Sequence, residues 1–317
     1  MHISKNGYIL ITGGAGFIGS HIVDRLLSMN YNVKVIDNLS TGNINNLQNA
    51  MKNKNFKFIY GSITDMELLR REMKNVELIC HQAALGSVPR SIEDPLTSHQ
   101  SNVNGFLNIV IIMSEYGIKR VVYASSSSVY GDSKVLPKRE EYIGEQLSPY
   151  AVTKYINELY AGIFYKIYGI ETIGLRYFNV FGPRQNPNGP YAAVIPRFII
   201  SLIRQEQVII NGDGSFTRDF TYIDNVVNAN ILALFSKNEK CYGEIFNIGA
   251  GGRVSLDELY NYISTNLNCG LEPIYGEERG GDIPHSNADI TKAKEMLGYA
   301  VEGSFNDYIK RTIGYYL

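Results

Sequence analysis

The chain has 317 residues, with 30 Lys or Arg against 31 Asp or Glu, so its formal net charge is -1. This balance gives no electrostatic reason to expect a nucleic-acid or membrane partner, and no apolar run reaches the ~18 residues of a spanning helix. The three cysteines and five histidines show no disulfide or zinc spacing, so no metal is expected. With no signal-peptide pattern before the first strand, we expect a soluble, cytoplasmic globular protein.

The first elements predict a dinucleotide site. Tyr8–Thr12 is a short apolar run typical of a buried parallel strand. It leads into a GxxGxxG motif over residues 13–19 and then into a helical pattern, so that the backbone can approach a pyrophosphate at a helix N-terminus. A second strand over 33–36 ends at Asp37, where an acid hydrogen-bonds the adenosine ribose of NAD and repels the extra phosphate of NADP.

Alternating strands and helices continue to about residue 178. Further strands are predicted over residues 56–61, 78–81, 120–124 and 172–178. Helices are predicted from about Pro95 to Tyr116 and from near Pro149. This order predicts an α/β fold with a doubly wound, Rossmann-type parallel sheet over residues 1–178. The turn-rich remainder, 179–317, predicts a smaller C-terminal α/β domain for substrate, with the chain crossing back to the first domain.

A tyrosine and a lysine predict the chemistry. Tyr150 and Lys154 stand at i and i+4, which places the phenol and the ammonium on one helix face. An unperturbed tyrosine titrates near pH ~10, but a neighbouring cation favours the phenolate, as a bound nicotinamide would. The run Ser125–Ser128 ends the fifth strand, at the edge where ligands bind in such sheets, and could relay a proton from a substrate alcohol.

Two polar clusters mark the C-terminal part. They are Arg218-Asp219-Phe220 and Arg279-Gly280-Gly281-Asp282. Arginine is suited to binding a diphosphate. Solvated surface arginines would give the same pattern.

Motifs spread over nearly the whole chain resemble the extended short-chain dehydrogenase/reductase family. They are TGGAGFIGS (12–20), the serine run before Val129-Tyr130-Gly131, SPYAVTK (148–154), RYFNVFGPRQ (176–185) and RDFTYIDN (218–225). Within the family the chain is most similar to nucleotide-sugar 4-epimerases. The stretches ALGSVPRS (84–91) and NPNGPYAAVIP (186–196) are similar to those of bacterial UDP-N-acetylglucosamine 4-epimerases. The resemblance implies NAD as cofactor, a UDP-sugar substrate and a homodimer.

The resemblance also implies residue roles. Tyr150 would be the base, paired with Lys154, and the assisting hydroxyl would be Ser126, four residues before Tyr130, or Ser127. The residues implied for NAD are Gly13, Gly16, Phe17, Ile18, Gly19, Asp37, Asn38, Ser40, Thr41, Gly42, Ile63, Asp65, Gln82, Ala83, Ala84, Asn102, Tyr150, Lys154 and Tyr177. Those implied for the substrate are Gly86, Ser87, Ser126, Ser127, Tyr150, Asn179, Ala193, Val194, Arg218, Arg279, Asp282 and Ser286.

The implied reaction is the reversible 4-epimerisation of UDP-N-acetylhexosamines through a transient 4-keto sugar. Tyr150 takes the proton of the 4-hydroxyl through a serine while a hydride leaves C4 for NAD, and the hydride returns to the other face. NAD is regenerated in each cycle, so no external redox partner is needed. Ser286 matches the position where epimerases specific for non-acetylated sugars carry a tyrosine, so the sequence predicts room for an N-acetyl group.

Other readings stay open. The substrate could instead be UDP-glucose or a UDP-uronic acid, the latter for 4-epimerisation or decarboxylation. A 4,6-dehydratase needs an extra acid and base, and an Asp-Glu pair typically follows its catalytic hydroxyl; Ser127 and Ser128 occupy those places here. A nucleotide-binding regulator could share the scaffold, but it should have lost the Tyr150–Lys154 pair, which this chain retains.

Overall fold

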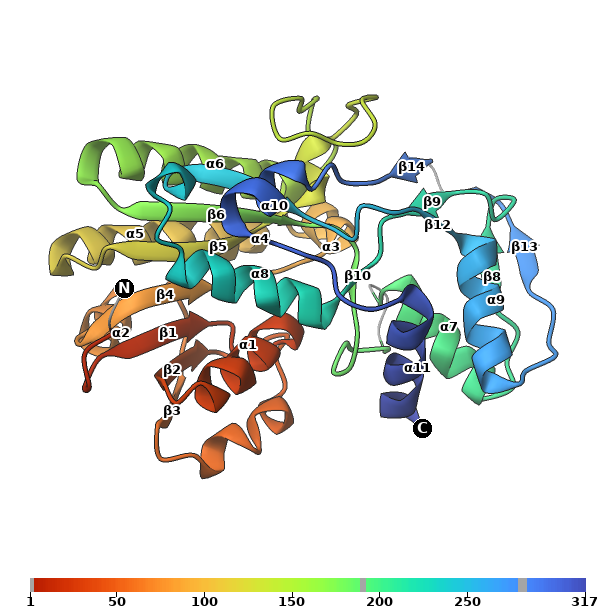
Figure 1. Ribbon diagram of the computed structural model, residues 1–317, viewed down its shortest axis with the longest axis horizontal. Coiled ribbons are helices and arrows are strands. Elements are labelled where there is room, and N and C mark those ends of the chain that lie inside the picture. Colours follow the sequence, from red (N-terminus) through yellow and green to blue (C-terminus); the bar gives the residue numbers. More distant parts are fainter. Residues whose placement is uncertain (1–2, 189–191, 279–283) are drawn as a thin grey trace.

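The computed structural model describes residues 3–188, 192–278 and 284–317. A seven-stranded sheet organises most of the chain, with strand order β11-β6-β5-β4-β1-β2-β3 (Figure 1). Its strands are β1 (Tyr8–Thr12), β2 (Asn32–Asp37), β3 (Phe56–Tyr60), β4 (Val76–His81), β5 (Arg120–Ser126), β6 (Glu171–Tyr177) and β11 (Glu244–Ile248). All neighbours in this sheet pair in parallel, which confirms the predicted doubly wound Rossmann-type sheet.

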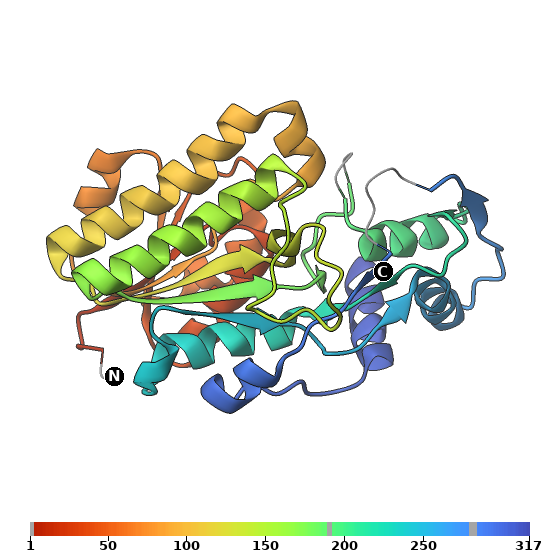
Figure 2. The same cartoon turned by 90° about the horizontal axis from the view of Figure 1, so that it is seen from above.

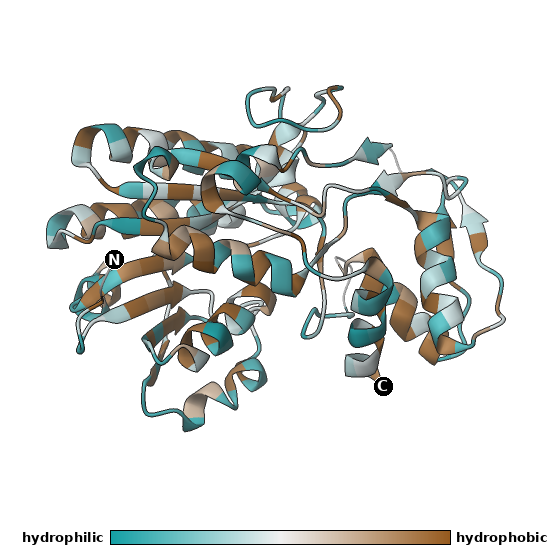
Figure 3. Cartoon of the chain, viewed as in Figure 1, coloured by the Kyte–Doolittle hydropathy of each residue, from teal (hydrophilic) through white to brown (hydrophobic). Residues whose placement is uncertain are grey.

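Helices cover both faces of the sheet. The helices α1 (Phe17–Ser28) and α8 (Ile223–Phe235) contact each other on one face, while α5 (Gly105–Tyr116) and α6 (Pro149–Tyr168) run side by side on the other (Figure 2). Consecutive residues of β1 serve the two layers, because side chains alternate along a strand. Ile9 and Ile11 belong to the α1/α8 core and Leu10 to the α5 core. The middle residues of the inner strands are accordingly mostly hydrophobic (Figure 3).

The helix predicted from Pro95 to Tyr116 is interrupted. It consists of α4 (Pro95–His99), a π-helical turn, η3 (Gln100–Asn104), and α5. A further short helix, α3 (Val88–Glu93), precedes it and was not predicted. Turns of π-helix often occur at functional sites, and this one carries Asn102.

Most short elements of the C-terminal part lie beyond the carboxyl ends of the strands of the large sheet, whereas α10 (Thr291–Leu297) packs against β11 and α8 (Figure 1). The other helices of this part are α7 (Val194–Ile203), α9 (Leu256–Leu267) and α11 (Phe305–Tyr316). Its strands form three small sheets: β12 (Val254–Ser255), β9 (Thr217–Arg218) and β14 (His285–Ser286); β13 (Ile274–Gly276) and β8 (Ile209–Asn211); β10 (Thr221–Tyr222) and β7 (Val180–Phe181). Between them, α8 and β11 return to the large sheet. The domain boundary at residue 178 stays a prediction.

The remaining helical elements are short. They are α2 (Met66–Glu72) and the 3₁₀ turns η1 (Ile44–Leu47), η2 (Ala50–Lys52), η4 (Ser127–Tyr130) and η5 (Glu239–Cys241). Over the residues that the structure describes, no helix has both the length and the apolar character needed to cross a bilayer.

Candidate active site

A cleft opens at the carboxyl edge of the large sheet, with an empty volume of about 1510 Å³ including the part open to solvent. Its walls come from the loops after β1, β2, β3 and β4, from the end of β5 and from the start of α6. Strands of a parallel sheet end at one edge, so segments far apart in sequence meet there. All residues implied for NAD line this cleft except Asp65 and Asn102.

Asp65 and Asn102 instead hydrogen-bond backbone groups of segments next to the cleft. The Oδ1 atom of Asp65 accepts a hydrogen bond from the Leu68 backbone N–H at 3.0 Å, so Asp65 caps α2. Asn102 is buried and clamps the Leu85 backbone: its Oδ1 accepts from the Leu85 N–H at 2.7 Å and its Nδ2 donates to the Leu85 carbonyl at 3.2 Å. Nδ2 also donates to Thr153 Oγ1 on α6 at 3.1 Å. Asn102 therefore fixes the loop that leads into Gly86, and a direct contact with NAD stays a prediction.

The glycine-rich loop has the shape of a pyrophosphate cradle. Gly13 has φ +69°, and a Cβ there would lie 2.6 Å from the Ala83 backbone nitrogen. A Cβ on Gly19 would lie 2.2 Å from the Gly13 carbonyl oxygen, so only glycine lets α1 approach the loop so closely. Gly16 is the N-cap of α1 and provides no side-chain cap. The first N–H groups of the helix therefore lack a capping side chain, an arrangement that suits a bound anion.

Asp37 closes the other end of the cradle. Its Oδ2 accepts from the Ala15 N–H at 2.9 Å and its Oδ1 from the Leu39 N–H at 2.8 Å. Each carboxylate oxygen retains a further acceptor site, which ribose hydroxyls can use. The glycine cradle, the uncapped helix and this acid together fit an adenine dinucleotide.

The Tyr150–Lys154 pair lies at the start of α6. Pro149 occupies the first turn and the Ser148 hydroxyl accepts from the Ala151 N–H at 3.2 Å, so the sequence fixes where the helix begins. Lys154 is buried and donates through Nζ to the Ala124 carbonyl at 2.8 Å. The same Nζ lies 5.9 Å from the centroid of the Tyr150 ring. Both side chains line the cleft.

The electrostatics of this pair are set first by burial. Burial raises the pKa of Tyr150, and a hydrogen bond with Ser126 opposes the rise. Burial lowers the pKa of Lys154 to about 8, and the charge of Glu158 opposes that shift. The hydroxyls of Ser126 and Ser128 lie 2.5 Å apart. The contacts of Ser126 favour it over Ser127 as the assisting hydroxyl.

The residues implied for the substrate are partly brought together. Gly86 and Ala193 line the cleft, whereas Ser87 caps α3 and Val194 begins α7. Three others meet in the small sheets: Ser286 pairs in register with Arg218, and Asn179 Nδ2 donates to the Asp219 carbonyl at 3.2 Å. Arg279 and Asp282 lie outside the described residues.

The protein-family comparison identifies the chain. The model of the NAD dependent epimerase/dehydratase family matches residues 9–249. The chain belongs to this family. A UDP-glucose 4-epimerase of Mycolicibacterium smegmatis is 36% identical over 310 residues, which cover 97% of each chain.

Solved structures of similar proteins agree with this family. The UDP-glucose 4-epimerase of Thermotoga maritima with UDP-glucose is 39% identical, has a TM-score of 0.92 and is matched over 98% of each chain. The UDP-N-acetylglucosamine 4-epimerase of Methanobrevibacter ruminantium with UDP-N-acetylmuramic acid is 38% identical, with a TM-score of 0.93 over 99% of each chain. The fold and the NAD cofactor predicted from the sequence are thereby confirmed.

This family member has residues around the site that the sequence did not indicate. One is Glu158, which is buried, accepts from Ser125 at the cleft wall and pairs with Arg176. On the other face, Asn230 of α8 contacts both Gln82 and Tyr177, at 3.1 Å and 2.8 Å. The spacing of Glu158 from Lys154, one helical turn, was the available signal for the first group. For Asn230 no local signal existed, because α8 reaches the site only through the fold.

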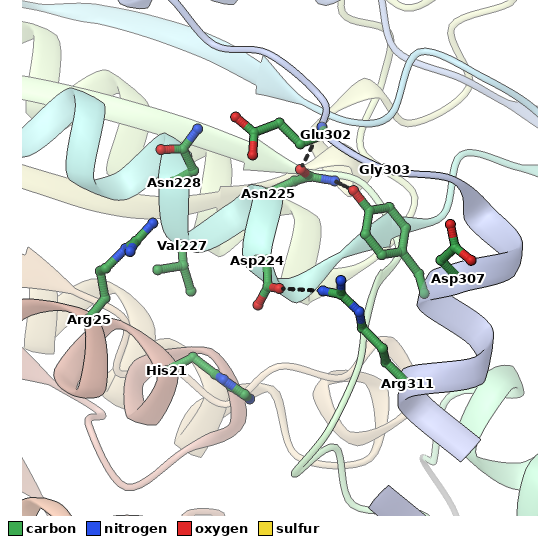
Figure 4. Close-up of a pocket in the computed structure, with 11 residues that line it drawn as sticks. His21, Arg25, Asp224, Asn225, Val227, Asn228, Glu302, Gly303, Asp307 and Arg311 are labelled. Atoms are coloured by element: carbon green, nitrogen blue, oxygen red, sulfur yellow. Dashed lines mark hydrogen bonds and ion pairs between the residues drawn. The ribbon is translucent and has the colours of Figure 1, made fainter. Parts of the chain in front are cut away.

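A second hollow of this epimerase/dehydratase lies between α1, α8 and α11 (Figure 4). Asp224 and Arg311 face each other there at 3.5 Å. Asn225 donates to the Tyr308 hydroxyl and accepts from the Glu302 N–H, each at 3.3 Å. These contacts fasten the C-terminal helix to α8. Across the part of the chain that the structure describes, no cluster of His, Cys, Asp and Glu could hold a metal ion.

Proposed function

We propose that the protein catalyses the reversible 4-epimerisation of UDP-N-acetylhexosamines, converting UDP-GlcNAc to UDP-GalNAc and back. The observation that carries the proposal is the convergence of Tyr150, Lys154 and Ser126 beside a cleft shaped for NAD. The acetylated substrate class is proposed from the identity of Ser286, which pairs in register with Arg218.

In the proposed reaction Tyr150 removes the proton of the sugar 4-hydroxyl, with Ser126 relaying it. The glycine loop and Asp37 would hold NAD, which when bound would supply a reversible hydride acceptor for C4. Because burial raises the pKa of Tyr150, positive charge beside the phenol is needed for it to act as a base at neutral pH. Lys154, one turn along α6, supplies such a charge. Tyr150 then returns the proton when the 4-keto sugar has turned over in the cleft.

The diphosphate is assigned to the C-terminal part. The Arg218 guanidinium donates through Nη1 to the carbonyls of Thr217 and Pro284 at 3.0 and 3.1 Å, which holds it at the β9–β14 pair. The planar guanidinium of an arginine presents five donors in a fork that matches phosphate oxygens, which suits Arg218 to a diphosphate. Arg279 and Asp282 are proposed to complete the UDP site, with Asn179.

The choice of an acetylated sugar rests on Ser286. A 4-epimerase must hold its sugar in two orientations, so the C2 substituent sweeps a wide arc. Serine at this position leaves room for an N-acetyl group, whereas a tyrosine would fill it. The similar proteins do not select the substrate, since their names include both UDP-glucose and UDP-GlcNAc epimerases. UDP-glucose 4-epimerisation is therefore the second candidate.

A homodimer is proposed from exposed apolar side chains on neighbouring helices. They are Ile92 of α3, Leu96 of α4, and Leu159, Ile163 and Ile167 of α6. Such a patch usually marks an association surface. Light scattering should give a dimer mass for the wild type and a monomer mass for Ile163→Glu. The control is Ile274→Glu, since Ile274 on β13 is equally exposed (46% against 48%).

Product analysis tests the function. The purified enzyme is incubated separately with UDP-GlcNAc and UDP-Glc, and products are identified by proton NMR. We expect UDP-GalNAc to form rapidly from the first and UDP-Gal slowly or not at all from the second. A 4-keto-6-deoxy sugar as the stable product would establish a dehydratase instead. Rapid turnover of UDP-Glc alone would overturn the substrate assignment.

A further inference from the structure

Three residues of α6 share one face at i, i+4 and i+8: Tyr150, Lys154 and Glu158. The first two line the cleft, but Glu158 lies one turn deeper and is 5% exposed. A buried carboxylate is costly unless it is paired and hydrogen-bonded. The contacts of the Glu158 carboxylate therefore show what stabilises it and which site residues it holds.

The Glu158 carboxylate is fully engaged. Arg176 of β6 donates to it bidentately, from Nε to Oε1 at 2.9 Å and from Nη2 to Oε2 at 2.8 Å. The Ser125 hydroxyl donates to Oε1 at 2.5 Å. The guanidinium is itself fixed, because Nη1 donates to the Glu140 carbonyl at 3.0 Å and the group lies over the Tyr130 ring, 4.8 Å from its centroid.

The end of β5 thus contacts the three α6 side chains through three consecutive residues. The Ala124 carbonyl accepts from Lys154, the Ser125 hydroxyl donates to Glu158, and the Ser126 hydroxyl bonds with Tyr150. Ser125 lines the cleft with Lys154, so a shift of Glu158 would be transmitted to the reacting groups.

We propose that Glu158 is a positioning residue of the active site. Clamped by Arg176, its carboxylate holds Ser125 at the end of β5 and supplies the negative charge that keeps Lys154 in its ammonium form. The inference rests on the proposed epimerase function, because it serves the Tyr150–Lys154 pair.

The surrounding charges support this assignment. Burial lowers the pKa of Lys154 to about 8, and Glu158 is the charge that opposes the shift. The other titratable groups facing this region are His81 of β4, Tyr123 of β5 and Arg176. Burial lowers the pKa of His81 to about 3 and raises that of Tyr123, so both are neutral at pH 7. Glu158 is therefore the one carboxylate among the groups named here that face Lys154.

The test compares two Glu→Gln variants. Glu158→Gln keeps the shape and the hydrogen-bond acceptor but removes the charge. Its control, Glu171→Gln, breaks a similar pair, Arg120–Glu171 at 2.6 Å, where β5 and β6 begin, at the opposite edge of the sheet. The Lys154 titration is followed by NMR of enzyme carrying ¹³C at lysine Cε, with its signal identified by loss in Lys154→Met. The alkaline limb of kcat against pH is measured in parallel.

In Glu158→Gln we expect the Lys154 titration and the alkaline limb to move to lower pH by about one unit, and neither to move in Glu171→Gln. Identical Lys154 titration in the wild type and Glu158→Gln would overturn the inference. If the single variant does not fold, the double variant Glu158→Gln/Arg176→Gln should show a smaller shift in the same direction, because loss of the Arg176 cation partly offsets loss of the Glu158 carboxylate. A wild type without epimerase activity would refute the proposed function, while the NMR titration would still decide this inference.

Discussion

The two sides of the cleft are built in different ways. On the cofactor side, the glycine loop, Asp37 and the Tyr150–Lys154 pair each follow a long strand of one parallel sheet or begin the helix packed on it. On the substrate side, Arg218 and Ser286 lie on two-residue strands that pair across 68 positions of sequence. Motifs of the first kind are positioned by a repeating geometry, whereas those of the second depend on a particular long-range pairing.

Polar side chains hold the loops on both sides, but they join different kinds of segment. The Asp219 carboxylate, next to Arg218, accepts from the N–H groups of Ala250, Gly251 and Ala288, at 2.7, 3.0 and 3.0 Å. Short strands offer few ladder bonds, so this buried carboxylate links segments that the small sheets alone do not hold together. On the cofactor side, Asp37 and Asn102 also bind backbone groups, but their loops start from a continuous sheet.

The largest effect is expected from breaking the chemistry of the cofactor side alone. Tyr150→Phe should lower kcat by ~10²–10⁴-fold, the usual size of general acid–base catalysis, with nearly unchanged substrate binding. Turnover of UDP-GlcNAc is measured by NMR and binding by calorimetry. The matched control is Tyr168→Phe, on the exposed end of α6, which should retain wild-type kcat. Near-normal turnover of Tyr150→Phe would exclude it as the base.

A change confined to the substrate side should alter selectivity rather than chemistry. Ser286→Tyr should abolish turnover of UDP-GlcNAc and UDP-GalNAc while sparing UDP-Glc and UDP-Gal. Steric exclusion can far exceed the ~1–3 kcal/mol of one lost methylene contact, so kcat/KM for the acetylated sugars should fall by more than ~10²-fold. The non-acetylated sugars serve as the internal control. If kcat/KM for UDP-GlcNAc stays close to the wild-type value, Ser286 does not set the selectivity.

Asp37→Ala tests cofactor binding alone, because Asp37 is not one of the proposed reacting groups. It removes an ionised acceptor, and such hydrogen bonds are worth ~1.5–3 kcal/mol, so the Kd for NAD should rise about 10–100-fold. Calorimetry with NAD and NADP measures this. Asp213→Ala, which breaks a comparable contact with the Ser215 N–H at 2.9 Å outside the cleft, should leave the Kd unchanged. Wild-type protein that binds NADP as tightly as NAD would contradict the role of Asp37.

The smallest effect is expected on the pH dependence of stability, through buried His81 on one side and buried Asp219 on the other. Burial lowers the pKa of His81 to about 3, below its usual 6.5, so its contribution to stability is present above pH 6.5 and is lost as pH falls toward 3. Burial raises the pKa of Asp219 to about 6, above its usual 3.8, so its contribution is present below pH 3.8 and is lost as pH rises through 6. The slope of the unfolding free energy against pH, from urea titrations at pH 4–7, should therefore become less positive in His81→Gln and more positive in Asp219→Asn. The change is at most about 1.4 kcal/mol per pH unit, and curves parallel to the wild type would contradict both assignments.

Local sequence patterns were enough to predict the cofactor half of the site. The GxxGxxG spacing, the acid ending the second strand and the i, i+4 pair are local patterns, and a parallel sheet carries each of them to the same edge. The predicted strands agree with β1–β6 to within two residues at each end. The physical reason is that side-chain period and strand-end geometry repeat in every βαβ unit.

The long-range contacts around the cleft could be seen only in the tertiary structure. It placed β11 at the edge of the large sheet, brought Asn230 of α8 beside Gln82 and Tyr177, and set Glu158 against Ser125 and Arg176. These contacts join segments separated by up to 148 positions, and no local pattern specifies which polar groups will meet. Burial then decided their chemistry, because the pKa directions of Tyr150 and Lys154 depend first on the exclusion of water.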